Sequence, residues 1–125
     1  MKKLHTLKNK ILRVEINNYQ KQKGVDLFMS NKVLITNSQK AVKVPSGLRI
    51  LIRRACNAVL EYEHFEAPAE ISVTFVDNAA IAELNNQYRN KPMPTDVLSF
   101  PLGVDGKYDV DENNGCKMLG DIVIS

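Results

Sequence analysis

The chain carries six segments whose hydrophobic pattern predicts a helix or a strand. Short apolar or alternating runs typical of β-strands occur at residues 32–37, 71–75, 97–100 and 119–125. Between the first and second runs, and again between the second and third, apolar residues recur at three- and four-residue spacing, as in an α-helix with one buried face. The predicted order is therefore β-α-β-α-β-β.

The first predicted helix begins after Pro45 and ends before Pro68. Its apolar residues form one stripe that we expect to face the sheet: Leu48, Leu51, Ile52, Ala55, Val59 and Tyr62. The charged residues off this stripe, which suit solvent, are Arg49, Arg53, Arg54 and Glu61.

The second predicted helix begins at Asp77 or Asn78, because either side chain is a good N-cap. It must end near Asn90, because Pro92 and Pro94 cannot continue a helix. Its inward face is expected to consist of Ile81, Leu84 and Tyr88.

These elements predict an α/β (α+β) fold with a small, mixed four-stranded sheet and helices packed on it. The last two strands have no helix between them, which favours antiparallel pairing, and residues 102–117 are expected to form an exposed loop. Two helices can cover much of one face of this sheet and little of the other. We therefore expect apolar residues of the last two strands to be partly exposed, which suggests missing C-terminal structure.

Charge divides the 125 residues into two parts. Residues 1–28 contain seven basic and two acidic side chains, whereas residues 29–125 have a net charge of −2. We interpret residues 29–125 as the folded domain and 1–28 as a basic extension. The extension has an apolar helical stripe that would suit an RNA or membrane surface (Leu4, Leu7, Ile11 and Val14). We favour instead a disordered leader, or a misplaced start with Met29 as the true first residue.

The sequence shows neither an export signal nor an apolar run long enough for a membrane span, so the cytoplasm is the expected compartment. The two histidines, His5 and His64, do not have the spacing of a zinc site. His64 is expected at a helix end. Cys56 is expected to be a small core residue, and Cys116 to be exposed in the loop without a histidine partner.

Three further residues are candidates for chemistry. Arg89 ends the second helix, where its guanidinium suits either a phosphate or the negative end of the helix dipole. Asp96 follows a Pro-Thr pair and is expected to accept backbone N–H bonds in a turn. Asp121 is expected to bond across to the third strand or to face a cleft. A cluster of four carboxylates is interpreted as part of a solvated loop and not as a calcium site: Asp105, Asp109, Asp111 and Glu112.

Three motifs occur in order: L-N-x-x-Y-R at residues 84–89, P-T-D-V-L-S-F-P at 94–101 and L-G-D-I-x-I at 119–124. Together they resemble the YbeY family of rRNA maturation factors, over residues 31–125. Pro92 departs from the family pattern, which often has an aspartate there. The family also continues beyond this point with a segment that contains three histidines.

The resemblance implies a metalloprotease-like scaffold that lacks its C-terminal helices here. It implies a zinc-dependent endoribonuclease that cuts single-stranded RNA, in 16S rRNA 3′-end maturation and ribosome quality control. Arg89 would be the catalytic residue. The resemblance favours a phosphate contact for its guanidinium over an interaction with the helix dipole alone. The zinc ligands would be the later histidines, so no metal is expected on these 125 residues, and the chain alone is expected to be inactive.

The resemblance also implies the small ribosomal subunit as a partner, together with a ribosomal protein or an assembly GTPase, and no membrane. Two alternatives stay open. One is a non-catalytic binding module that uses the same partners, and the other is a remnant without function.

Overall fold

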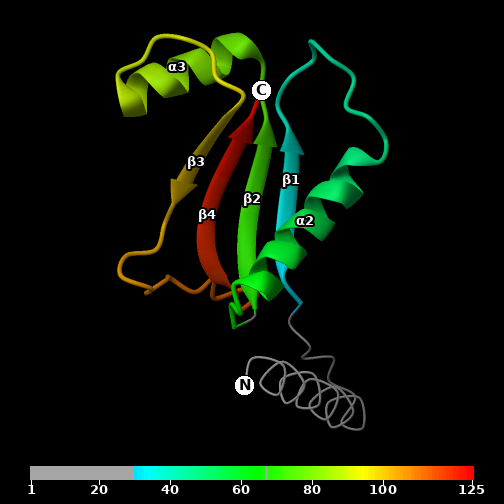
Figure 1. Cartoon of the computed structure of the whole chain (residues 1–125), viewed down its shortest axis with the longest axis vertical. Helices are drawn as coiled ribbons and strands as arrows, with labels where there is room; N and C mark the ends of the chain where they lie inside the picture. The colour runs from blue at the N-terminus through cyan, green and yellow to red at the C-terminus, as the bar shows by residue number, and fades with distance from the viewer. Residues whose placement is uncertain (1–29, 67) are drawn as a thin grey trace, which may run out of the picture.

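The structure is a computed structural model that describes residues 30–66 and 68–125. Its elements, shown in Figure 1, are β1 (Lys32–Asn37), α2 (Leu48–Tyr62), β2 (Ala69–Phe75), α3 (Asn78–Arg89), β3 (Val97–Pro101) and β4 (Lys117–Ile124). The predicted element order and the mixed α+β class are confirmed. The basic extension at 1–28 lies outside the described residues, so the interpretation of it stays a prediction.

The four strands form one mixed sheet in the order β1-β2-β4-β3. Strand β2 pairs in parallel with β1 and with β4, and the predicted antiparallel pairing of β3 with β4 is confirmed. The β2–β4 ladder contains one bulge, because Glu70 pairs with Met118 whereas Ile71 pairs with Gly120. Gly120 has φ 143° there, and a Cβ would collide with the carbonyl oxygen of Phe100. The bulge therefore requires glycine.

The two helices pack on opposite faces of the sheet. Helix α2 buries Cys56 against Val33 and Val73, whereas α3 buries Ile81 against Leu98 and Val123. Val123 pairs with Thr74, the neighbour of Val73, and successive strand residues point to opposite faces. The expectation that both helices cover one face is therefore wrong. Helix α2 connects the parallel strands β1 and β2, and the right-handed rule for such crossovers determines which face of the sheet it covers. Helix α3 leads to β3, which runs antiparallel to β2, so the crossover rule does not apply to it.

The predicted apolar stripe of α2 is confirmed for Leu48 and Ile52 and wrong for its exposed members. The inward line follows four-residue spacing and consists of Leu48, Ile52, Cys56 and Leu60. Leu51, Val59 and Tyr62 lie on one flank of this line and are exposed by 62%, 60% and 80%. Arg49, expected in solvent, is half-buried and donates a hydrogen bond of 2.8 Å to the carbonyl of Ile35.

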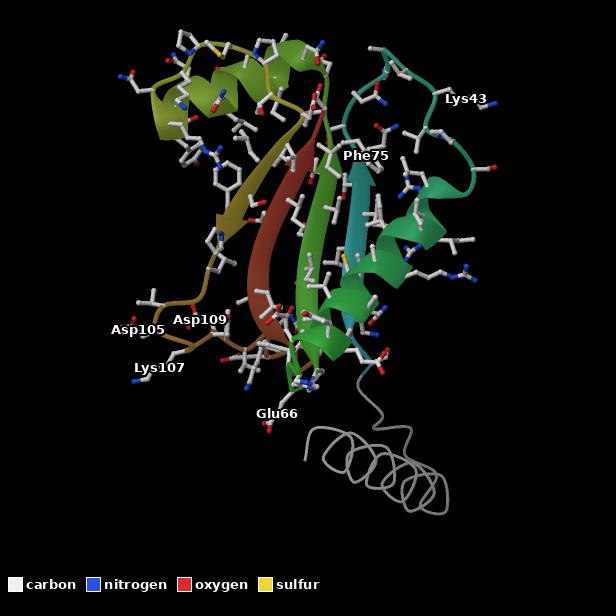
Figure 2. The ribbon with its side chains drawn as sticks, in the orientation of Figure 1. Lys43, Glu66, Phe75, Asp105, Lys107 and Asp109 are labelled. Atoms are coloured by element: carbon white, nitrogen blue, oxygen red, sulfur yellow. The ribbon has the colours of Figure 1, made fainter. Side chains whose placement is uncertain are left out.

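Residues 102–116 form the predicted loop, which connects the antiparallel strands β3 and β4. Tyr108 anchors the loop, because its ring packs edge-on against Phe65 with centroids 5.6 Å apart. Figure 2 shows Asp105 and Lys107 at its outer tip. Neither of the two described helices has the length and apolar character needed to cross a membrane.

Candidate functional site

The end of α3 is defined by its caps, as the sequence predicts. The Asp77 carboxylate accepts a hydrogen bond of 2.8 Å from the backbone N–H of Ala80 and begins the helix. Asn90 ends it in the left-handed conformation, with φ 56°, and its N–H donates to the carbonyl of Asn86. Arg89 is therefore the last helical residue, and its side chain is exposed.

Asn85 ties the turn after α3 back to the helix. Asn85 is a buried polar residue, with only 4% of its surface exposed. Its side-chain amide donates to the carbonyl of Met93 at 2.9 Å, and its backbone carbonyl accepts from the N–H of Lys91 at 3.3 Å. Sequence reasoning missed this role, although an asparagine one turn after the inward-facing Ile81 was the available signal. The turn that carries Lys91 is thereby fixed relative to Arg89.

An aromatic pair lies beside Arg89. The Tyr88 and Phe100 rings meet edge to face, with centroids 4.9 Å apart and planes at 64°. Phe100 comes from β3 and is half-buried, whereas Tyr88, predicted to face inward, remains 60% exposed. Successive residues of an α-helix are rotated by about 100° around its axis, so the side chains of Tyr88 and Arg89 project on opposite sides of the Asn85 side chain. Of the two, Tyr88 is the one that faces β3, because its ring contacts Phe100.

The two candidate aspartates occupy different places. Asp121 lies on β4 directly opposite Phe100, and its side chain is exposed on the same face as the aromatic pair. Asp96 precedes β3, where its main-chain carbonyl accepts a hydrogen bond of 2.9 Å from the N–H of Ser125. Among the described residues, no backbone N–H donates to the Asp96 carboxylate, so the turn role expected for this side chain is not observed. Of the two, Asp121 is the one on the strand face that carries Phe100.

The described residues contain no group of three or more histidine, cysteine or acidic side chains placed to hold a metal ion. His64 lies just beyond the end of α2, as predicted, and is exposed. In the acidic loop, Asp111 accepts a hydrogen bond of 2.8 Å from the N–H of Asn113, so this carboxylate shapes a turn. His5 lies outside the described part of the chain.

The two cysteines are both buried, which confirms the expectation for Cys56 and contradicts that for Cys116. The side chain of Asn114 draws the loop inward, because its amide donates to Glu70 on β2 at 2.7 Å and its oxygen accepts from the N–H of Cys116 at 2.8 Å. Burial raises the pKa of both thiols above the ordinary value. A protonated, covered thiol is a poor nucleophile.

One cleft among the described residues is lined by none of the candidate residues Arg89, Asp96 and Asp121. It has a volume of about 580 Å³ and lies where the segment after β1 stands over the carboxyl ends of β2 and β4. Its lining is mostly apolar and includes Val42, Val44 and Phe75. Two charged residues contribute to the lining. Figure 2 shows Lys43 pointing away from Phe75, and the carboxylate of Asp77 is used to cap α3. The cleft therefore lacks a constellation for catalysis.

Comparison with known proteins gives a consistent result. The family model described as Endoribonuclease YbeY matches residues 34–125. The chain is 45% identical over 98 residues to the Endoribonuclease YbeY of Alkaliphilus oremlandii, covering 75% of this chain and 60% of the relative. It is 40% identical over 103 residues to that of Acetivibrio thermocellus (75% and 62%) and 40% identical over 102 residues to that of Alkaliphilus metalliredigens (78% and 61%). The chain spans about three fifths of the length of these relatives.

Proposed function

Because this chain belongs to the YbeY endoribonuclease family, we propose that it acts in the hydrolysis of single-stranded RNA. The proposed substrate is the RNA of the small ribosomal subunit, in 16S 3′-end maturation and in ribosome quality control. The observation that carries the proposal is the exposed Arg89 at the capped end of α3, within a family match that begins inside β1 at Leu34 and includes the other three strands in full.

Arg89 suits an RNA backbone for a physical reason. A guanidinium stays charged at all physiological pH values and offers a planar fork of donors that matches two phosphate oxygens. Lys91 adds a second exposed cation, and the hydrogen bonds of Asn85 hold its segment in place. In the proposed reaction, Arg89 binds the scissile or a neighbouring phosphate and offsets the negative charge that develops on it.

Zinc dependence belongs to the proposal, but the described residues do not fit a zinc site. Zinc sites take three or four ligands from histidine, cysteine and carboxylate side chains, and no three such side chains among the described residues are placed to hold a metal ion. We therefore assign these residues the binding of RNA and no step at a metal.

A second candidate function is a non-catalytic binding module that docks a ribosomal protein or an assembly GTPase. The exposed apolar side chains of α2 (Leu51, Val59 and Tyr62) favour it, because exposed apolar residues suit a protein partner. The two proposals differ in the role of Arg89, because a protein-docking module has no need of a phosphate fork at this position.

The proposals are separated by measuring the affinity of the full chain for a ten-nucleotide RNA in single-stranded and duplex form. We expect tighter binding of the single strand and a loss of about tenfold in the Arg89→Gln variant, as for one charge-assisted contact of about 1.4 kcal/mol. The matched control is Arg54→Gln, which removes an exposed cation of α2. Equal losses in both variants, or equal affinity for the duplex, would contradict the proposed role of Arg89.

A further inference from the structure

We propose that Tyr88, supported by Phe100, is a stacking platform for one unpaired nucleobase, next to the phosphate bound by Arg89. This inference rests on the proposed function and specifies which part of the RNA each residue contacts. It assigns the aromatic pair to the base and the two cations to the backbone.

The first argument is the orientation of the Tyr88 ring. A tyrosine that is 60% exposed is ordinarily free to change rotamer, but this ring meets Phe100 at 64° with centroids 4.9 Å apart. The edge-to-face contact fixes its plane and leaves most of its surface uncovered. An oriented aromatic ring with only two side-chain torsions loses little conformational entropy when a flat ligand stacks on it.

The second argument is the charge around the ring. Arg89 and Lys91 are exposed cations on the side of the α3 terminus, whereas the exposed carboxylate of Asp121 lies beside Phe100 on β4. A phosphate is attracted toward the helix end and repelled from the strand side. An RNA strand at this site therefore places its backbone against α3 and turns its base toward the aromatic pair.

The third argument is selectivity for single strands. In a duplex both faces of every base are covered by stacking, so a platform of this kind accepts only a base that has left the helix. Stacking on a tyrosine is possible for all four bases. The platform thus predicts a preference for unpaired RNA without a strong preference for sequence.

The test uses the full chain and two five-nucleotide single-stranded RNAs, one with 2-aminopurine at its centre and one with an abasic residue there. We expect the base-bearing RNA to bind about tenfold more tightly, with quenched 2-aminopurine fluorescence. Tyr88→Leu keeps an apolar cover over Phe100 but removes the π-face, so the two RNAs should then bind equally. Tyr88→Phe should retain the difference.

The matched control is Tyr62→Leu, which alters a tyrosine that is even more exposed but lies on α2 beside Glu61 and Glu63. It should leave the affinity ratio unchanged. Wild-type-like discrimination in Tyr88→Leu would overturn the inference alone, provided that Arg89→Gln still weakens binding of both RNAs. No binding of either RNA by the folded wild-type chain would overturn the inference together with the proposed function.

Discussion

The two helices use their apolar residues differently. Helix α3 buries Ile81 completely against β3 and β4 and leaves its polar and aromatic end exposed. Helix α2 covers β1 and β2 with one line of side chains, and a whole flank with Leu51, Val59 and Tyr62 stays exposed. Figure 1 shows α2 over the β1–β2 half and α3 near the upper end of β3. An apolar helix residue is therefore not by itself evidence of a contact in this chain.

The exposed flank of α2 faces the uncovered half of the sheet. The opposite flank carries Asn57, whose side chain bonds that of Asn31 next to β1 at 2.9 Å, so the apolar flank points toward β4. On the same face of the sheet, Ile122 and Ile124 are only half-buried and Val97 is 47% exposed. The expected partial exposure of the last two strands is confirmed, and it continues onto the helix. A continuous apolar surface of this kind is typical of an interaction surface.

The largest expected effect is on the packing of α3. Ile81→Ala should lower the free energy of unfolding by about 3 kcal/mol, because it opens a cavity at a fully buried position. Val59→Ala on the exposed flank of α2 should change it by less than about 0.5 kcal/mol. Urea denaturation followed by circular dichroism measures both. Similar losses in the two variants would show that the α2 flank is covered in solution.

A smaller effect is expected at the turn that follows α3. Asn85→Ala removes the donor to the Met93 carbonyl and should cost about 1–3 kcal/mol of stability. The control is Asn86→Ala, whose side chain is exposed and whose loss should cost less than about 0.5 kcal/mol. Amide hydrogen exchange should also accelerate at Lys91, because its N–H donates to the main-chain carbonyl of residue 85 in a turn that loses its side-chain anchor. Unchanged exchange there would contradict the proposed tie between the turn and the helix.

The smallest effect concerns the thiols. A group whose pKa is raised by folding favours the folded state at pH values below its unfolded pKa, and this contribution is lost as pH rises through the folded value. Because burial raises the pKa of Cys56 and Cys116 above 9.0, stability should fall as pH increases beyond about 9. Chemical denaturation between pH 7 and pH 10 should show a weaker decline in Cys116→Ala. An identical decline in both proteins would refute this contribution of Cys116.

Local signals in the sequence predicted α3 and its boundaries well. Asp77 and Pro92 act on the backbone within a few residues, so their effect does not depend on the rest of the fold. The element order and the antiparallel final pair follow from similar short-range patterns.

The failures concern contacts between distant residues. The burial of Cys116 depends on the bond between Asn114 and Glu70, 44 residues apart in the chain. Which residues of α2 face the sheet depends on which strands the helix covers, and the spacing of apolar residues along the helix does not specify those strands. At the candidate site, Arg89 was identified, but the pairing of Tyr88 with Phe100 required the β3 position.

The central claim, that single-stranded RNA binds at the end of α3 and not on the apolar flank of α2, is tested most directly by NMR titration. Backbone amide shifts of the full chain would be followed as a short single-stranded RNA is added. We predict that the largest changes fall at Tyr88, Arg89, Lys91 and Phe100, with little change at Leu51 and Val59. Changes concentrated on α2, with the end of α3 unaffected, would contradict the account.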